Sequence, residues 1–311
     1  MSDLLDKLAR RAPGICLYGI APPKLTTAPD RLAELVAIHK ERFASLAPDG
    51  LIVYDIQDEA DRNSAPRPFP FLPTIPPEQY AHELLASVTV PKIVYKSVAN
   101  TTAASLHDWS RKLSGDDSAG LAVLVGASSA RAAGTGLRLE EAYDLMRANA
   151  PDVVLGGIAI PERHAVKGDE HERILRKVAR GCRFFVTQTV YDATGVKSML
   201  SDYYYALRKT DGVPVPIILT FSPCGSPKTL ELMRWLGISI PRWLENELLN
   251  DADVLTRSIR LCEELCADVV AFAREKGLPL GVNVESISIR RAEIDASLEL
   301  FQRLRQLLAR T

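Results

Sequence analysis

The chain has 311 residues, of which 47% are hydrophobic and 25% are charged, enough for one large α/β domain or two small ones. The net charge of -1 excludes a general attraction to nucleic acid or to an anionic membrane, so the expected partner is a small molecule. Residues 1–14 are charged and amphipathic, without the apolar core of a secretory signal, and no apolar run reaches membrane-spanning length. These features predict a soluble, cytoplasmic protein.

Short apolar runs alternate with segments of helical periodicity along the whole chain. Each run is typical of a buried parallel strand, and the segment that follows is typical of a helix covering the sheet. The predicted strands span 15–20, 50–56, 91–98, 120–127, 152–160, 183–191, 215–222 and 279–287. The predicted helices span 30–46, 78–87, 101–114, 139–149, 168–180, 193–208, a broken pair at 227–249, then 251–276 and 290–309.

Eight strand–helix units in this length predict a single-domain α/β protein, a (β/α)8 TIM barrel that spans residues 1–311. A doubly wound sheet would more often show a glycine fingerprint after its first strand, where this chain has APPK at 21–24. The longest irregular segment, 57–77, contains six prolines. We expect this Pro-rich loop to be stiff and to fold over the catalytic face of the barrel.

Polar residues gather where the predicted strands end, which is the end of a TIM barrel that carries reacting groups. The segment RFFVTQTVYD at 183–192 is the clearest case, because an apolar run ends in Thr187, Gln188 and Tyr191. The structural alternative is that these are ordinary strand residues whose polar groups satisfy nearby backbone. The other candidates at strand ends include Asp55, Gln57, Asp58, Glu59, Asn100, His164, Phe221 and Glu285.

Two further patterns bear on cofactors and metals. The loop 126–136, which contains Gly126 and Ser128, lacks the Walker and Rossmann patterns, but its backbone could approach a ligand closely. His164, Glu170 and His171 resemble a metal cluster, yet no HExxH or comparable spacing supports one, and we predict no metal site. The five cysteines are widely spaced and odd in number, which indicates neither a disulfide framework nor a zinc ribbon.

Several segments occur in one order: APP at 21–23, GIAIPERH at 157–164, RKVARGCRFFVTQTVYD at 176–192, PIILTFSPCGSPKTLELMRWLGISIPRWLENEL at 216–248 and GVNVESISIRRAE at 281–293. Together they resemble the methylenetetrahydrofolate reductase family. Members of that family are TIM-barrel enzymes that reduce 5,10-methylenetetrahydrofolate to 5-methyltetrahydrofolate. The resemblance implies a tetrahydrofolate substrate and an oxidoreductase of one-carbon metabolism.

The resemblance also implies roles for individual residues. Gln188 matches the glutamine that contacts the pterin, and Arg291 matches the arginine of the family's closing motif. Arg173, Arg176 and Lys177 fall where the family's helix meets the cofactor phosphates, and a cationic cluster there suits a dinucleotide. The expected substrate-binding residues are Gln57, Asn100, Gln188, Tyr191, Phe221, Glu285 and Arg291. The expected cofactor-binding residues are Gly126, Ser128, His164, Arg173, Arg176 and Lys177.

The chain departs from the family where flavin binds and where acid chemistry occurs. The first strand of the family reads FEFFPP, with a glutamate that is proposed to protonate the folate, whereas this chain reads YGIAPP with Gly19 in that place. The third-strand HLTC-like and fourth-strand LRGD motifs are replaced by KIVYK and LVGAS. These departures, with YDIQDE and PFPFLP, resemble the divergent flavin-independent reductases. They imply that NADH or NADPH donates hydride directly to the folate and that FAD is not needed.

Another acid would then have to replace the missing glutamate. Asp55, Asp58, Glu59 and Glu285 are the candidates, because a carboxyl partly desolvated under the loop 69–77 could keep a proton near neutral pH. We favour the second-strand carboxylates as catalytic residues, since YDIQDE places Asp55, Gln57 and Glu59 at alternate positions. The charged loop could equally be solvated and held by local ion pairs.

Three other functions stay open. The first is a conventional FAD-dependent reductase, and the second is a noncatalytic folate-binding or partner-binding barrel. The third is a different C1-transfer enzyme on the same barrel. Apolar residues on 241–249 could form the interface of a homo-oligomer or could merely cap the barrel.

Overall fold

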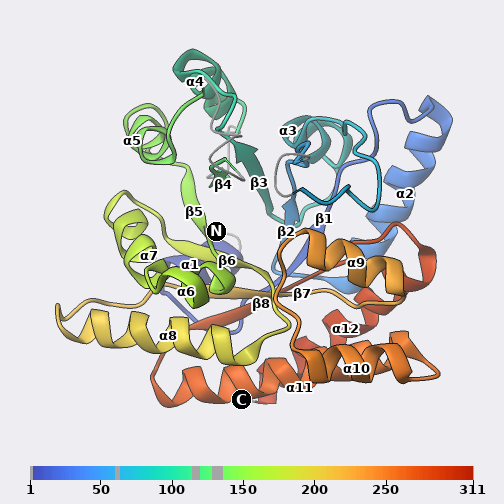
Figure 1. The fold of residues 1–311 in the computed structure, drawn as a ribbon. Helices are drawn as coiled ribbons and strands as arrows, with labels where there is room; N and C mark the ends of the chain where they lie inside the picture. Colours follow the sequence, from blue (N-terminus) through green and yellow to red (C-terminus); the bar gives the residue numbers. More distant parts are fainter. Residues whose placement is uncertain (1–2, 60–63, 114–119, 128–135, 311) are drawn as a thin grey trace.

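The computed structural model describes residues 3–59, 64–113, 120–127 and 136–310. Its strands are all parallel and form one closed barrel in the order β1 to β8, which confirms the predicted TIM barrel (Figure 1). The strands are β1 Cys16–Ile20, β2 Gly50–Val53, β3 Lys92–Ser97, β4 Leu121–Val125, β5 Val154–Ala159, β6 Phe184–Thr189, β7 Ile217–Phe221 and β8 Leu280–Glu285.

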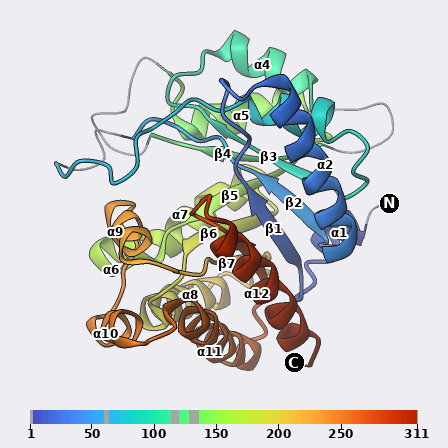
Figure 2. The ribbon, with the colours of Figure 1, turned by 90° about the vertical axis from the view of Figure 1, so that its right-hand side faces the viewer.

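Helices surround the barrel, and most of the predicted ones form (Figures 1 and 2). They are α1 Asp3–Ala9, α2 Pro29–Leu46, α3 Pro77–Gln79, the π-helix η2 Tyr80–Leu84, α4 Ala103–Arg111, α5 Leu139–Asn149, α6 Pro161–Lys167, α7 Glu170–Ala179, α8 Ala193–Arg208, α9 Pro227–Trp235, α10 Arg242–Asn250, α11 Val254–Glu275 and α12 Arg291–Arg310. Helix α6 was not predicted. None of the helices in these ranges is long and apolar enough to cross a membrane.

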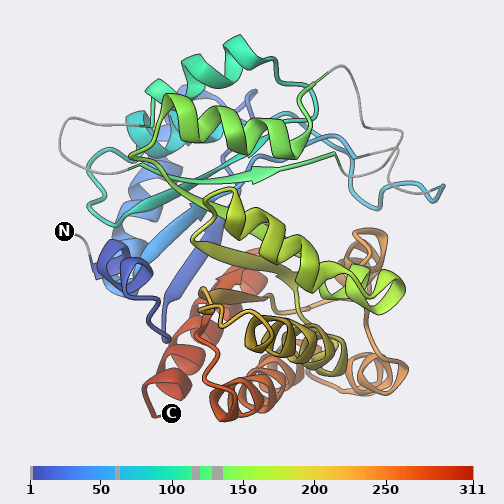
Figure 3. The ribbon, with the colours of Figure 1, turned by 90° about the vertical axis from the view of Figure 1, so that its left-hand side faces the viewer.

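Two apolar layers hold the barrel together, because successive strand residues point alternately inward and outward. The inner layer includes Leu17, Ile52 and Phe184, and the outer layer packs the strands against the helices. Helix α1 contributes Leu4 and Leu8 to the inner layer. Figures 2 and 3 show α1 at one end of the barrel and α9 at the other, so α1 closes the end opposite to the strand C-termini.

The Pro-rich segment makes contacts at both of its described ends. Thr74 forms an antiparallel bridge with Lys24, after β1. At the other end, the carbonyl of Ala65 accepts a hydrogen bond of 2.9 Å from Trp235 Nε1 on α9, and the Arg67 guanidinium lies 5.2 Å from the centroid of the Trp235 ring. The segment therefore runs from α9 to the β1–α2 connection, at the end of the barrel where the strands terminate.

Candidate functional site

The interior of the barrel changes from apolar to polar at the C-terminal ends of its strands. In β8, Val282 and Val284 belong to the outer apolar layer, so the alternate residues Asn283 and Glu285 face inward. Glu285 is the last residue of β8 and lies opposite Gly19 of β1 in the parallel register. A carboxylate thus lies beside the glycine at the inner mouth of the barrel.

Gly19 leaves space that the ring of Tyr54 fills. A Cβ atom at Gly19 would lie 2.7 Å from both Cε2 and the hydroxyl of Tyr54, closer than any real Cβ contact. The Tyr54 hydroxyl accepts a hydrogen bond of 2.9 Å from Asn283 Nδ2 and lies close enough to the Glu285 carboxylate to lower its pKa. Three neighbouring strands, β8, β1 and β2, which meet where the barrel closes, therefore form one cluster of polar side chains.

Glu285 lies in surroundings that favour its protonated form. Burial raises the pKa of the Glu285 carboxyl, while hydrogen bonds from Tyr54 and from Thr189 act in the opposite direction. Thr189 Oγ1 donates at 3.1 Å to Glu285 Oε1. The side chain retains some exposed surface, so protein surrounds its carboxyl but a ligand in the mouth can reach it. Such a carboxyl can hold a proton at higher pH than an ordinary glutamic acid.

Two buried polar atoms beside this carboxylate have no hydrogen-bond partner among the described residues. They are the Tyr95 hydroxyl and Asn283 Oδ1. The ring of Tyr95 packs edge-on against Tyr54 with centroids 5.0 Å apart, and the charge of Glu285 adds to the burial that raises the pKa of Tyr95. Buried polar groups are normally satisfied, so this hydroxyl and amide oxygen point to a bound water molecule or a polar ligand.

An irregularity in β6 completes the group. The pairing of β6 with β7 shifts between Val186 and Thr189, which brings Thr189 to Glu285. Gln188, in the same irregular stretch, is half-buried and donates from Nε2 to the carbonyl of Leu236 at 2.7 Å. Gln188 is therefore fixed at the strand end by its amide nitrogen, and no buried atom of it lacks a partner.

The second-strand carboxylates have three different environments. Asp55 accepts hydrogen bonds from the Ser97 backbone N–H at 2.8 Å and from Gln57 Nε2 at 2.6 Å, and burial raises its pKa. Asp58 is exposed and Glu59 is half-buried. Asp55 thus ties β2 to β3 and positions Gln57. Asn100, in the turn after β3, is exposed.

Two of the expected substrate contacts are packed behind the strands, and a third is on the surface. Tyr191 and Phe221 are fully buried in the outer layer, between the barrel and the helices, because their places in the alternation point them outward. The Tyr191 hydroxyl donates to the Ser222 carbonyl at 2.7 Å. Arg291, at the start of α12, has a side chain that is 95% exposed and lies 3.7 Å from Asp295.

The expected phosphate-binding residues do not converge on one point. Arg173 pairs with Asp169, Arg176 pairs with Glu172, and Lys177 Nζ donates to the Ile158 carbonyl at 2.6 Å. Each of these α7 cations already has a partner, either a neighbouring carboxylate or a strand carbonyl. His164 lies on α6 beside Asp202. Gly126 follows β4, and Ser128 lies outside the described residues.

Sequence reasoning identified Glu285 and missed the residues around it. Tyr54, Tyr95, Thr189 and Asn283 were not among the candidates. The available signal was the period of two along each strand, since Ile52 and Ile93 face inward and therefore predict inward-facing Tyr54 and Tyr95.

The comparisons with known proteins agree with the barrel. No protein-family model and no curated protein matches the chain. A solved structure from Clostridium thermocellum, of a protein that binds two copies of 5-methyl-5,6,7,8-tetrahydrofolic acid, superimposes with a TM-score of 0.85 at 41% identity, covering 97% of this chain and 99% of that chain. A beta-1,4-mannanase superimposes with a TM-score of 0.52 at 10% identity, covering 95% of this chain and 99% of that one, which shows the fold alone.

Proposed function

The chain belongs to the same family as the 5-methyl-5,6,7,8-tetrahydrofolic acid-binding protein from Clostridium thermocellum, and we propose that it binds a tetrahydrofolate derivative in the mouth of its barrel. We propose further that it is a methylenetetrahydrofolate reductase that interconverts 5,10-methylenetetrahydrofolate and 5-methyltetrahydrofolate. The relationship at 41% identity over nearly the whole of both chains supports the ligand. The arrangement around Glu285 supports the chemistry.

The observation that carries the proposed chemistry is the pairing of Gly19 with Glu285. The related reductases have an acid at the position of Gly19, and here the ring of Tyr54 fills that space. Glu285 lies on the next strand, opposite Gly19 in the register, and its pKa is raised by burial. The acid is thereby supplied from β8 in place of β1, at the same inner edge of the barrel.

The reaction requires one proton and one hydride. The bond between the methylene carbon and N10 breaks, N10 takes the proton, and the methylene carbon becomes an iminium at N5. Hydride then adds to that carbon and gives the methyl group. In this scheme Glu285 delivers the proton to N10, which favours the ring opening because a neutral amine leaves more readily than an amide anion.

The residues around Glu285 have separate roles in this scheme. Thr189 holds the carboxylate by a hydrogen bond, and Tyr54 lies beside it and lowers its pKa. The Tyr95 hydroxyl and Asn283 Oδ1, which are buried and lack partners among the described residues, would become a donor and an acceptor for the polar edge of the pterin once the side chains that cover them move. Gln188, fixed by its amide nitrogen to Leu236, presents its amide oxygen as a further acceptor.

The proposed hydride donor is NADH or NADPH, whose reduced nicotinamide supplies the hydride when it is bound. The chain's part is to hold the ring against the pterin and to keep water from the iminium. Arg173 and Arg176 are each paired with a neighbouring carboxylate, so a phosphate bound at α7 would have to compete with those pairs. At Gly126, just after β4, an added Cβ would make only ordinary contacts with the described residues, the nearest of them Leu139 at 3.7 Å.

A noncatalytic folate-binding barrel is the second candidate, because the related Clostridium thermocellum protein is described by its binding of 5-methyltetrahydrofolate. Measurements on one preparation of the protein distinguish the two functions. Calorimetry with 5-methyltetrahydrofolate measures binding, and the visible spectrum of the purified protein measures bound flavin. Binding by colourless protein that also turns over supports the direct-transfer reductase, whereas binding without turnover supports the second candidate. Stoichiometric FAD would instead support a flavin enzyme.

A further inference from the structure

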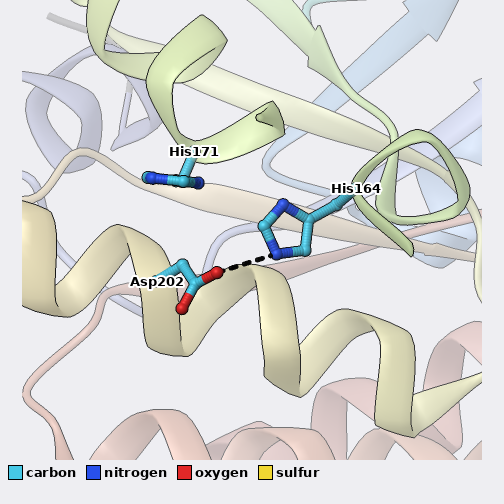
Figure 4. A group of neighbouring side chains, drawn as sticks. All are labelled: His164, His171 and Asp202. Atoms are coloured by element: carbon cyan, nitrogen blue, oxygen red, sulfur yellow. Dashed lines mark ion pairs between the residues drawn. The ribbon is translucent and has the colours of Figure 1, made fainter. Parts of the chain in front are cut away.

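A group of metal-ligating side chains lies on the helical layer, apart from the barrel mouth. His164 comes from α6, His171 from the first turn of α7 and Asp202 from α8 (Figure 4). Gly168, with a φ of 67°, ends α6 in the left-handed conformation and so allows the chain to turn into α7 within two residues. The turn brings two histidines seven positions apart to the same acidic residue of α8.

The three side chains are close enough to share one ion. His164 Nε2 lies 3.2 Å from Asp202 Oδ2, and one ligand atom from each residue lies within 4.8 Å of the other two. The imidazole rings of His164 and His171 are nearly perpendicular, with centroids 5.6 Å apart. Figure 4 shows the edge of the His171 ring facing His164 above the Asp202 carboxylate.

The histidines have unsatisfied polar atoms that the rest of the fold does not explain. Nδ1 of His164 and Nδ1 of His171 are both buried without a hydrogen-bond partner, and His164 is only 5% exposed. A buried polar nitrogen without a partner is unfavourable. No hydrogen bond at Nδ1 fixes the tautomer of either ring. The proton of the neutral ring can therefore be on either nitrogen, and the other nitrogen offers its lone pair.

We propose that His164, His171 and Asp202 bind one divalent first-row transition metal, for which Zn²⁺ is the natural probe. Two imidazoles and one carboxylate are a ligand set that zinc accepts, with water in the remaining position. Ligand distances of about 2.0 to 2.2 Å place tetrahedral ligand atoms roughly 3.3 Å apart. The 3.2 Å between His164 Nε2 and Asp202 Oδ2 already matches that spacing. Since one ligand atom of each residue lies within 4.8 Å of the others, rotation of the side chains is sufficient to bring the remaining pairs of atoms to that spacing.

The surroundings leave this group free for a cation. The neighbouring carboxylate Glu170 is occupied by Arg163 and by the backbone N–H of Ile160. Asp202 has a side chain that is 54% exposed, which gives the ion and its water a path from solvent. Bound metal would join α6 and α7 to α8, so its expected effect is on stability. This inference is independent of the folate chemistry.

The test uses the full chain, freed of metal by a chelator and dialysed. We expect calorimetry with Zn²⁺ to give one equivalent per chain, and we expect Co²⁺ to develop the visible d–d bands of a four-coordinate site. Asp202→Asn and His171→Gln should each weaken binding at least about tenfold. His107→Gln, an exposed histidine on α4, is the matched control and should bind as the wild type does.

Thermal unfolding provides a readout without enzymatic activity. Zn²⁺ should raise the midpoint of the wild type and of His107→Gln, and should leave that of Asp202→Asn nearly unchanged, because only a ligand of the folded state stabilises it. Absence of binding at micromolar Zn²⁺ would overturn the proposal. Equal binding by wild type and by the Asp202→Asn and His171→Gln variants would overturn it too, since the metal would then lie elsewhere.

Discussion

The Cα of Gly19 faces the ring of Tyr54 so closely that an added Cβ would lie 2.7 Å from Tyr54 Cε2. The missing side chain on β1 and the tyrosine on β2 are therefore complementary. Tyr54 in turn lies beside Glu285 on β8 and lowers the pKa of its carboxyl. The glycine at position 19 and the carboxylate at position 285 are thus parts of one arrangement, because the tyrosine that fills the space at the first position also neighbours the second.

Gly19→Ala tests this complementarity. The new methyl group should push the Tyr54 ring away and weaken its hydrogen bonds with Asn283 and Glu285, at a cost of about 1 to 3 kcal/mol in the free energy of unfolding, with a loss of turnover. Gly126→Ala is the matched control for stability, since its Cβ would make an ordinary contact of 3.7 Å with Leu139. Urea unfolding measures the free energy of unfolding of both variants. Equal stability of Gly19→Ala and wild type would contradict the tight fit.

Glu285→Gln should lower turnover by about 10²- to 10⁴-fold, because the amide cannot deliver the proton to N10. The binding of 5-methyltetrahydrofolate should remain, since glutamine has nearly the same size and retains hydrogen-bonding groups. Single-turnover kinetics measure the first effect and calorimetry measures the second.

Asp58→Asn and Glu59→Gln provide the comparison with the second-strand carboxylates. Asp58 is exposed, so we expect its variant to change turnover only a few-fold. If either second-strand variant lost most of its turnover while Glu285→Gln stayed active, the proton donor would lie in the segment YDIQDE and not at Glu285.

Tyr54→Phe should shift the pH dependence of turnover. The hydrogen bond from Tyr54 lowers the pKa of Glu285, so its removal should raise that pKa. Because the protonated carboxyl is the active form, turnover falls as pH rises through this pKa, and the fall should move to higher pH in the variant. The Tyr95 hydroxyl has no hydrogen-bond partner among the described residues. In Tyr95→Phe, turnover should therefore fall over the same pH range as in the wild type. An unshifted profile in Tyr54→Phe would argue against Glu285 as the proton donor.

The raised pKa of Glu285 also predicts a pH dependence of stability. The folded state holds the Glu285 proton more tightly than the unfolded state does, so this carboxyl favours folding at pH below its ordinary pKa and loses that contribution as pH rises through its raised pKa. Glu285→Gln removes the titrating carboxyl, so the variant does not lose this stability as the pH rises. The free energy of unfolding of the variant minus that of the wild type should therefore increase from acid to neutral pH. A constant difference would mean that the carboxyl is not desolvated.

Glu170→Ala should be among the most destabilising substitutions of a charged residue in the chain. Glu170 is fully buried, and its removal leaves the Arg163 guanidinium and the Ile160 backbone N–H without their partner, at a cost of about 3 to 5 kcal/mol. Glu172→Ala, which removes an exposed pair with Arg176, should cost less than about 1 kcal/mol. Similar unfolding free energies for the two variants would contradict this difference.

The fold was predictable because buried parallel strands are apolar throughout and each is followed by a helix. Every strand of the structure lies within its predicted range. Helix α6 was missed because PERHAVK is short and polar, although Pro161 at its start is a common first residue of helices.

The site was predictable only in part. The carboxylate at the end of β8 could be identified from its position after a strand. Its surroundings depend on contacts between distant residues, such as Tyr54 with Asn283, and on the irregular pairing that brings Thr189 to Glu285. No local pattern encodes such contacts. For the α7 cations, the family resemblance suggested a phosphate site, and the structure shows that Asp169 pairs with Arg173 and Glu172 with Arg176.

The central claim is tested most directly by the anaerobic oxidation of NADH with 5,10-methylenetetrahydrofolate, followed by absorbance, with colourless protein and no added FAD. We expect turnover that forms 5-methyltetrahydrofolate in proportion to the NADH consumed, with NADPH assayed in parallel. The absence of turnover with either nucleotide, in protein that binds 5-methyltetrahydrofolate, would contradict direct hydride transfer.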